Sequence, residues 1–160
     1  MRAAASIADR GLLENRAVGI TTNGHRAAIL PADRGARQHL KIMQLLAAVD
    51  ADGSEPLAES LINGLARLRR GMTAVIITSS RDRAWVRPLA ALRARGVACV
   101  VVLLDGPSFG RLADGTLAGD PGASVATPDQ ETRALRHALS EYELTVHWVT
   151  AGRPLAEALA

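Results

Sequence analysis

The chain has 160 residues, a length that suits one domain with a buried hydrophobic core. Hydrophobic residues make up 48% of the sequence but aromatic residues only 2%, so we expect a core of Ala, Val, Leu and Ile and no aromatic stacking surface for single-stranded nucleic acid. The formal charge of +3 comes from 19 basic and 16 acidic residues, an excess too small to indicate a nucleic-acid partner.

The sequence begins with a predicted helix that leads into a hairpin. Residues 3–14 carry apolar side chains at helical spacing. Two β-prone runs within residues 17–30 flank Asn23-Gly24, a dipeptide typical of hairpin turns. The following PADRG segment, residues 31–35, is expected to be a loop.

Two further helices are expected before the next strand. The first covers residues 35–49 and repeats apolar side chains at helical intervals. Its expected buried face consists of Leu40, Met43, Leu46, Ala47 and Val49. The second helix is expected to start after Ser54, which can cap it, and to continue to about Arg69.

The second half of the sequence alternates strands with helices. TAVIIT, Thr73–Thr78, is typical of a buried strand, and a helix is expected over residues 83–95, where Gly96 ends it. VACVVVLL, residues 97–104, lacks alternation, which predicts a strand buried on both faces.

The segment 105–126 is rich in Gly, Pro, Ala and Asp and is expected to be a flexible loop, functional or partly disordered. Residues 127–143 then predict a helix, residues 144–150 a last strand, and RPLAEALA a short terminal helix. Together these elements predict an α/β fold: a mostly parallel sheet with one antiparallel edge hairpin and helices on both faces.

One phrase carries a family resemblance. Leu30-Pro31, Arg34-Gly35, His39-Leu40 and Leu45 to Ala48 form the pattern LP..RG..HL..LL..LA. With LLENRAVGITTNG ahead of it and LAESLINGLARLRRGMTAVIITSS and LAALRARGVACVVVLLD behind, it resembles the C-terminal part of the domain of unknown function 58 family, over about residues 3–110.

The resemblance implies a bacterial protein with a von Willebrand factor A-like, Rossmann-like fold and no enzymatic activity. It also implies a protein-interaction role in complex assembly, with a MoxR-type AAA+ ATPase as the expected partner. Family members often carry this domain in the cytoplasm behind membrane helices. No apolar run in this chain is long enough for such a helix, so we expect a cytoplasmic chain.

The implied fold has a central first strand that ends in a DxSxS motif, and this sequence begins in the helix after that strand. We therefore expect residues 1–160 to be a single, truncated von Willebrand A-like domain, or another segment or chain to supply a strand, including a second copy in a homo-oligomer. The alternative is that residues 73–78 pair directly with residues 18–22.

The same resemblance leaves only a degenerate metal site. DxSxS is absent, Ser54 stands where the family fold has a threonine ligand, and Ser79 and Asp82 stand near the position of its last aspartate. Two hydroxyls and one displaced carboxylate are a poor ligand set for Mg²⁺, so no metal or other cofactor is expected. Ser80 or Asp82 is expected instead to cap the helix that follows.

The alternative function is that of an enzyme whose site lies at the carboxyl edge of the sheet. A small α/β metal- or nucleotide-dependent enzyme would use the side chains at the carboxyl ends of the strands. These are Asp52, Ser54, Ser79, Ser80, Asp82 and Asp105. No predicted strand is followed by the sequence pattern of a phosphate-binding loop. The only cysteine, Cys99, is expected to be buried within a strand.

Overall fold

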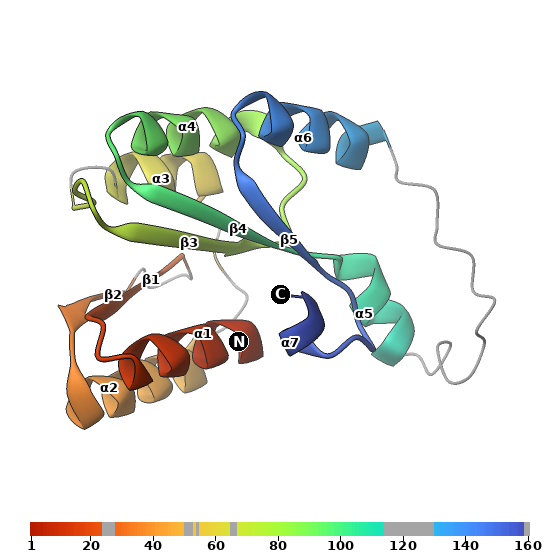
Figure 1. Ribbon diagram of the computed structural model, residues 1–160. Coiled ribbons are helices and arrows are strands. Elements are labelled where there is room, and N and C mark those ends of the chain that lie inside the picture. Colours follow the sequence, from red (N-terminus) through yellow and green to blue (C-terminus); the bar gives the residue numbers. More distant parts are fainter. Residues whose placement is uncertain (24–27, 50–52, 54, 65–66, 114–129, 159–160) are drawn as a thin grey trace. The chain divides into compact units, whose positions relative to one another are not determined.

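The computed structural model describes residues 1–23, 28–49, 53, 55–64, 67–113 and 130–158. Within these residues it contains seven α-helices, one 3-10 helix and five strands (Figure 1). The chain divides into two compact units, Met1–Ser60 and Leu61–Ala160, which are considered separately. No helix in the described ranges is long and apolar enough to cross a membrane.

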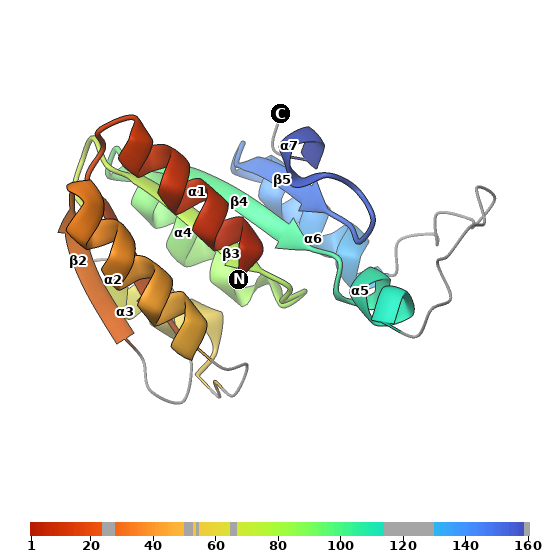
Figure 2. The same ribbon diagram turned by 90° about the horizontal axis from the view of Figure 1, so that it is seen from below.

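The first unit packs two helices on a hairpin. Strands β1 (Val18–Thr22) and β2 (Ala28–Asp33) pair antiparallel, while α1 (Arg2–Leu13) and α2 (Gly35–Ala48) lie side by side (Figure 2). The strands direct alternate side chains toward these helices. The core of the unit consists of Ala8, Ile42 and Leu46, with Ala4, Ala5, Leu12, Val18, Ile20, Leu30 and Met43 packed against it.

Two details of this unit differ from the sequence predictions. The expected loop at residues 31–35 is wrong for its first three residues, because β2 continues through Pro31 to Asp33. A register shift between Val18 and Ile20 accompanies this extension. Proline fits here because a strand of a two-stranded sheet has an edge on which no ladder hydrogen bond is required.

The buried face of α2 was predicted correctly at Met43 and Leu46, which lie against or in the core, and incorrectly at Leu40 and Ala47, which are exposed. The helix buries Gln38, Ile42 and Leu46, whereas Leu40 is 57% exposed. Gln38 explains why the helix turns this face toward the hairpin, because its side chain donates hydrogen bonds to the hairpin backbone. Helix α3 (Leu57–Gly64) has no fully buried residue and ends before the predicted Arg69.

The second unit contains a three-stranded parallel sheet in the order β3-β4-β5. Its strands are Thr73–Thr78, Ala98–Leu104 and Thr145–Val149, as the sequence predicts to within one residue at each end. Val101, Val102 and Leu103 of the central strand β4 are completely buried, which confirms that both of its faces are covered. Strand β3 instead alternates: Ala74 and Ile76 are buried, but Val75 is 38% exposed.

Helices α4 (Val86–Ala94) and α6 (Gln130–Glu141) lie on one face of this sheet (Figure 1). The short helix α7 (Leu155–Ala158) lies beside β5 on the opposite face, where Figure 2 shows it in front of the sheet. Helix α5 (Gly106–Ala113) follows β4 directly, so the first part of the expected 105–126 loop is helical. The rest of that segment lies outside the described residues.

Within the described residues, β1 pairs with β2 alone and β3 with β4 alone. The direct pairing of residues 73–78 with residues 18–22 is therefore not formed. The expected α/β class with a parallel sheet is confirmed, and the hairpin is a sheet of its own rather than an edge of the parallel sheet. Residues 2–13 are helical, as expected, and contain no strand.

Candidate functional site

The candidate site lies at the carboxyl end of the parallel sheet, where open α/β sheets commonly place their ligands. A series of short-range hydrogen bonds fixes the chain just after β3. The Ser80 amide donates to Thr78 Oγ1 at 3.0 Å and the Asp82 amide to Ser80 Oγ at 3.3 Å. The Ala84 amide then donates to Asp82 Oδ1 at 2.9 Å. These bonds hold the backbone in the turn that starts the next helix.

Asp82 is thus the N-cap of a 3-10 helix, η1 (Arg83–Trp85), which runs directly into α4. The capping role expected from the sequence is observed. A carboxylate in this position accepts one of the amide hydrogens that a helix start leaves without a partner. One of its two oxygens is therefore already engaged in local structure.

A partly buried ion pair joins the ends of β3 and β4. Arg81 Nη2 lies 3.3 Å from Asp105 Oδ1 and 3.4 Å from the carbonyl oxygen of Leu104. The exposed fractions of the two charged side chains are 16% and 28%. The guanidinium therefore occupies the position beside Asp105 where a bound cation would otherwise balance this carboxylate.

The backbone around Asp105 extends this arrangement to β5. The Asp105 amide donates to the Val149 carbonyl at 2.9 Å. Ser108 Oγ donates to the Asp105 carbonyl at 2.7 Å and accepts from the Ala151 amide at 2.9 Å. The residue after β4 is thus fixed as part of the structure.

Trp148 of β5 adds an aromatic surface to the edge. The guanidinium carbon of Arg136 lies 4.2 Å from the Trp148 ring centre, and that of Arg81 lies 5.5 Å from it, both within cation–π range. Arg81 Nη1 is buried and finds no hydrogen-bond partner among the described residues. An unpaired buried donor is costly, so this nitrogen marks a place where an acceptor oxygen would be favourable.

The structure brings together only some of the side chains predicted to form a site at the carboxyl ends of the strands. Asp52 and Ser54 lie outside the described residues. Asp82 and Asp105 follow neighbouring strands, but Asp82 caps η1 and Asp105 pairs with Arg81. Across the described part of the chain, no three His, Cys, Asp or Glu side chains form a group that could hold a metal ion.

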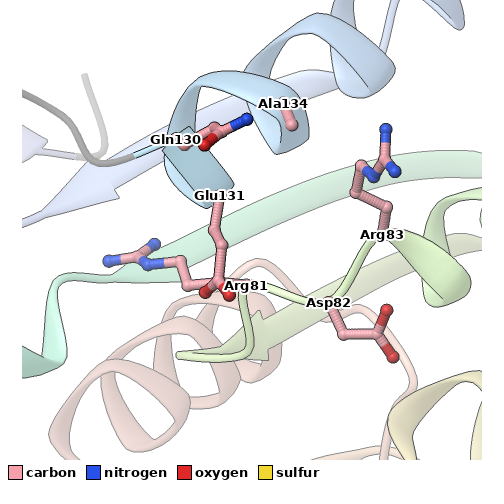
Figure 3. Close-up of a pocket in the computed structure, with 6 residues that line it drawn as sticks. All are labelled: Arg81, Asp82, Arg83, Gln130, Glu131 and Ala134. Atoms are coloured by element: carbon pink, nitrogen blue, oxygen red, sulfur yellow. The ribbon is translucent and has the colours of Figure 1, made fainter.

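Two adjoining depressions lie between the 81–83 segment and α6. The larger, of about 830 Å³, is shown in Figure 3 and is lined by Arg81, Asp82, Arg83, Gln130, Glu131 and Ala134. The smaller, of about 540 Å³, is lined by Arg83, Gln130, Arg133, Ala134 and His137. Neither depression was predicted from the sequence, although the spacing of Arg133 and His137 places both side chains on one face of a predicted helix.

The open edge of β3 is the other notable surface. Its six residues form a regular parallel ladder with β4 on one side and with no described residue on the other. The strand contains no proline, charged residue or bulge, the usual features that protect exposed strand edges from pairing.

Cys99 is not a nucleophile of this site. It is 8% exposed in β4, and its Sγ lies 3.5 Å from the Val97 carbonyl oxygen and 3.8 Å from that of Leu89. Burial raises the pKa of its thiol above the usual 9.0, although nearby Arg93 opposes the shift. A thiol held in its neutral form is a weak nucleophile.

Comparisons with known proteins add no relative. No family model, no curated protein and no solved structure matches this chain.

Proposed function

We propose that this protein is a non-enzymatic interaction module with von Willebrand A-like architecture, which binds a partner protein by accepting a strand at the edge of β3. The observation that carries the proposal is that β3 pairs on one side only among the described residues. Edge strands of regular geometry bind extended segments of other proteins through main-chain hydrogen bonds. The family resemblance favours a MoxR-type AAA+ ATPase as the partner, with a second copy of the chain as the alternative.

The direction of the backbone groups identifies the available edge. The Ala98 amide donates to the Met72 carbonyl at 2.9 Å, so the backbone groups of Met72 face β4. Because these groups alternate sides along a strand, those of Ala74 and Ile76 also face β4. The amides and carbonyls of Thr73, Val75 and Ile77 then face the open edge.

The side chains at this edge suit a protein partner. Thr, Val and Ile are β-prone residues that pack well against a neighbouring strand. Val75 is 38% exposed and Met72, just before the strand, is 41% exposed. An added strand would cover both side chains and satisfy the outward backbone groups in one step.

The chemistry of the carboxyl edge supports a non-enzymatic role. Asp82 and Asp105, the two described carboxylates of the predicted set, each already have a structural partner. Both carboxylates therefore have a role in holding the local structure together. This favours the interaction module over the metal- or nucleotide-dependent enzyme.

The test is sedimentation of the MoxR-type ATPase from the source organism with three versions of the chain. Val75→Pro removes an outward N–H without removing a hydrogen bond to β4, so it should abolish co-sedimentation and preserve the fold. Val75→Thr keeps the N–H and is the matched control, which should bind like the wild type. Equal binding by Val75→Pro, or no binding by the wild type to the ATPase or to itself, would contradict the proposal.

A further inference from the structure

A second surface follows from the smaller depression beside α6. Gln130, Arg133, Ala134 and His137 occupy positions i, i+3, i+4 and i+7, which share one face of a helix. Arg83 of η1 lines the opposite side. Among the described residues that line it, every polar side chain can donate a hydrogen bond and none is a carboxylate.

The two arginines have no charge partner in the part of the chain that the structure describes. Neither Arg83 nor Arg133 forms an ion pair there, and both side chains are exposed. His137, the third basic side chain of the lining, does have a partner, because its Nδ1 lies 3.4 Å from Glu141 Oε1. Two unpaired guanidinium groups on facing elements form a local positive surface on a chain whose overall charge is only +3.

Two carboxylates near this surface, those of Asp82 and Glu131, line the larger depression. Figure 3 shows Arg83 extending toward the side on which α6 lies, whereas the Asp82 carboxylate points away from α6. Glu131 extends from α6 toward the segment that carries Arg81. Arg83 and Arg133 therefore form the positive part of this surface, and Glu141 lies beside its His137 end.

We propose that this surface binds an acidic, extended segment of the partner protein, an inference that rests on the proposed interaction function. Guanidinium groups bind carboxylates through paired hydrogen bonds. Arg133 and His137 are separated by about 6 Å along the helix, and alternate residues of an extended peptide by about 7 Å. A Glu-x-Glu segment would thus place successive carboxylates beside successive donors.

The lining distinguishes this occupant from others. Among its described lining residues only Ala134 is apolar, whereas small-molecule sites are lined mostly by apolar side chains. None of these described residues is aromatic, so none offers a ring on which a nucleic-acid base could stack. An acidic peptide needs neither feature and matches the charge.

The experiment measures binding of a fluorescein-labelled peptide, Gly-Glu-Thr-Glu-Thr-Glu-Gly, by fluorescence anisotropy at low ionic strength. The wild type should bind, and the double variant Arg83→Glu/Arg133→Glu should bind at least about tenfold more weakly. Arg69→Glu/Arg153→Glu changes the net charge equally at two exposed arginines of the same unit that do not line the depression, and should lose less than about twofold, because separated surface charges are screened.

Three results would overturn the proposal. They are the absence of wild-type binding, an equal loss in both double variants, and tighter binding of inorganic phosphate than of the peptide at the same arginines. Val75→Pro should bind the peptide like the wild type. A failure of the peptide assay is thereby distinguished from a failure of the strand-acceptor proposal, which is measured with the ATPase.

Discussion

The side-chain amide of Gln38 donates to the Val18 carbonyl over 2.7 Å, and the same nitrogen donates to the Pro31 carbonyl over 2.9 Å. Gln38 is 1% exposed, so these bonds form away from water and join α2 to both strands of the hairpin. They lie beside the register shift between Val18 and Ile20, where the ladder itself is interrupted. One buried amide thus takes over the role of backbone pairing at this point.

Replacing Gln38 by Leu should destabilise the chain by about 1–3 kcal/mol, because two partly buried carbonyls would lose the buried amide that donates to them. The free energy of unfolding is measured by urea titration, and the two proteins are compared with the same dependence of that free energy on urea concentration. Gln44→Leu, at an exposed position of the same helix, is the control and should change it by less than about 0.5 kcal/mol. Equal effects of the two substitutions would contradict a structural role for the Gln38 amide.

Gly19→Ala should destabilise the same hairpin. A Cβ atom at this position would lie 2.8 Å from both the Ala32 nitrogen and the Leu30 oxygen, which are backbone atoms that cannot move aside alone. We expect a loss of about 1–3 kcal/mol, typical of overpacking. Gly64→Ala is the control because nothing lies within 4 Å of its added Cβ. Thermal unfolding should show a lower midpoint for the Gly19 variant only.

These two residues show where sequence reasoning was insufficient. The spacing of Leu40, Met43, Leu46 and Ala47 indicated the helix correctly but its buried side only in part, since Leu40 and Ala47 are exposed. Polarity suggested that Gln38 is outside, whereas two carbonyls at an irregular ladder make its burial favourable. Pro31 was read as part of a loop for a similar reason, since the edge that tolerates it exists only once the strands have paired.

The second unit was easier to predict because its strands have clear composition and clear boundaries. Gly96, with φ +82, ends α4 as expected, and the unbroken apolar run before Asp105 is the central strand. The first part of the 105–126 segment was misread because its glycine and proline content concealed α5, which begins at Gly106-Pro107. Proline is well tolerated in a first helical turn.

Of the candidate site, the sequence located the edge but not its partners. Ser79, Asp82 and Asp105 were correctly assigned to the carboxyl ends of strands. The pairing of Asp105 with Arg81 depends on two strands that are adjacent in space and 24 residues apart in sequence. No local pattern contains that information.

Substitutions at Asp82 separate a helix cap from a metal ligand. Asp82→Ala should lower the free energy of unfolding by about 1 kcal/mol, since the Ala84 amide loses its acceptor. Asp82→Asn should retain most of the stability, because asparagine caps as well as aspartate but is a weaker ligand for Mg²⁺. The measurement is urea unfolding with and without magnesium, manganese or nucleotide.

None of these additions should raise the melting temperature of the wild type, because the described carboxylates of this edge already have structural partners. A clear increase that disappears in both Asp82 variants would instead support the metal-dependent alternative. An increase that survives in Asp82→Asn would point to ligands elsewhere.

The thiol of Cys99 should make stability depend on alkaline pH. Its pKa is raised by burial, so the unfolded chain releases this proton before the folded chain does. The contribution is therefore fully present below pH 9.0 and is lost as pH rises through the folded-state pKa. Urea unfolding between about pH 8 and about pH 10 should show a steeper decline for the wild type than for Cys99→Val. Parallel curves would show that the thiol contributes nothing.

Strand addition at β3 is measured by hydrogen exchange at single amides. When the ATPase or a second copy binds, the amides of Val75 and Ile77, which face the open edge, should become protected by at least about tenfold. The amides of Ala74 and Ile76, already bonded to β4, should change little. Binding that leaves Val75 and Ile77 as exchangeable as in the isolated chain would rule out a strand added to β3.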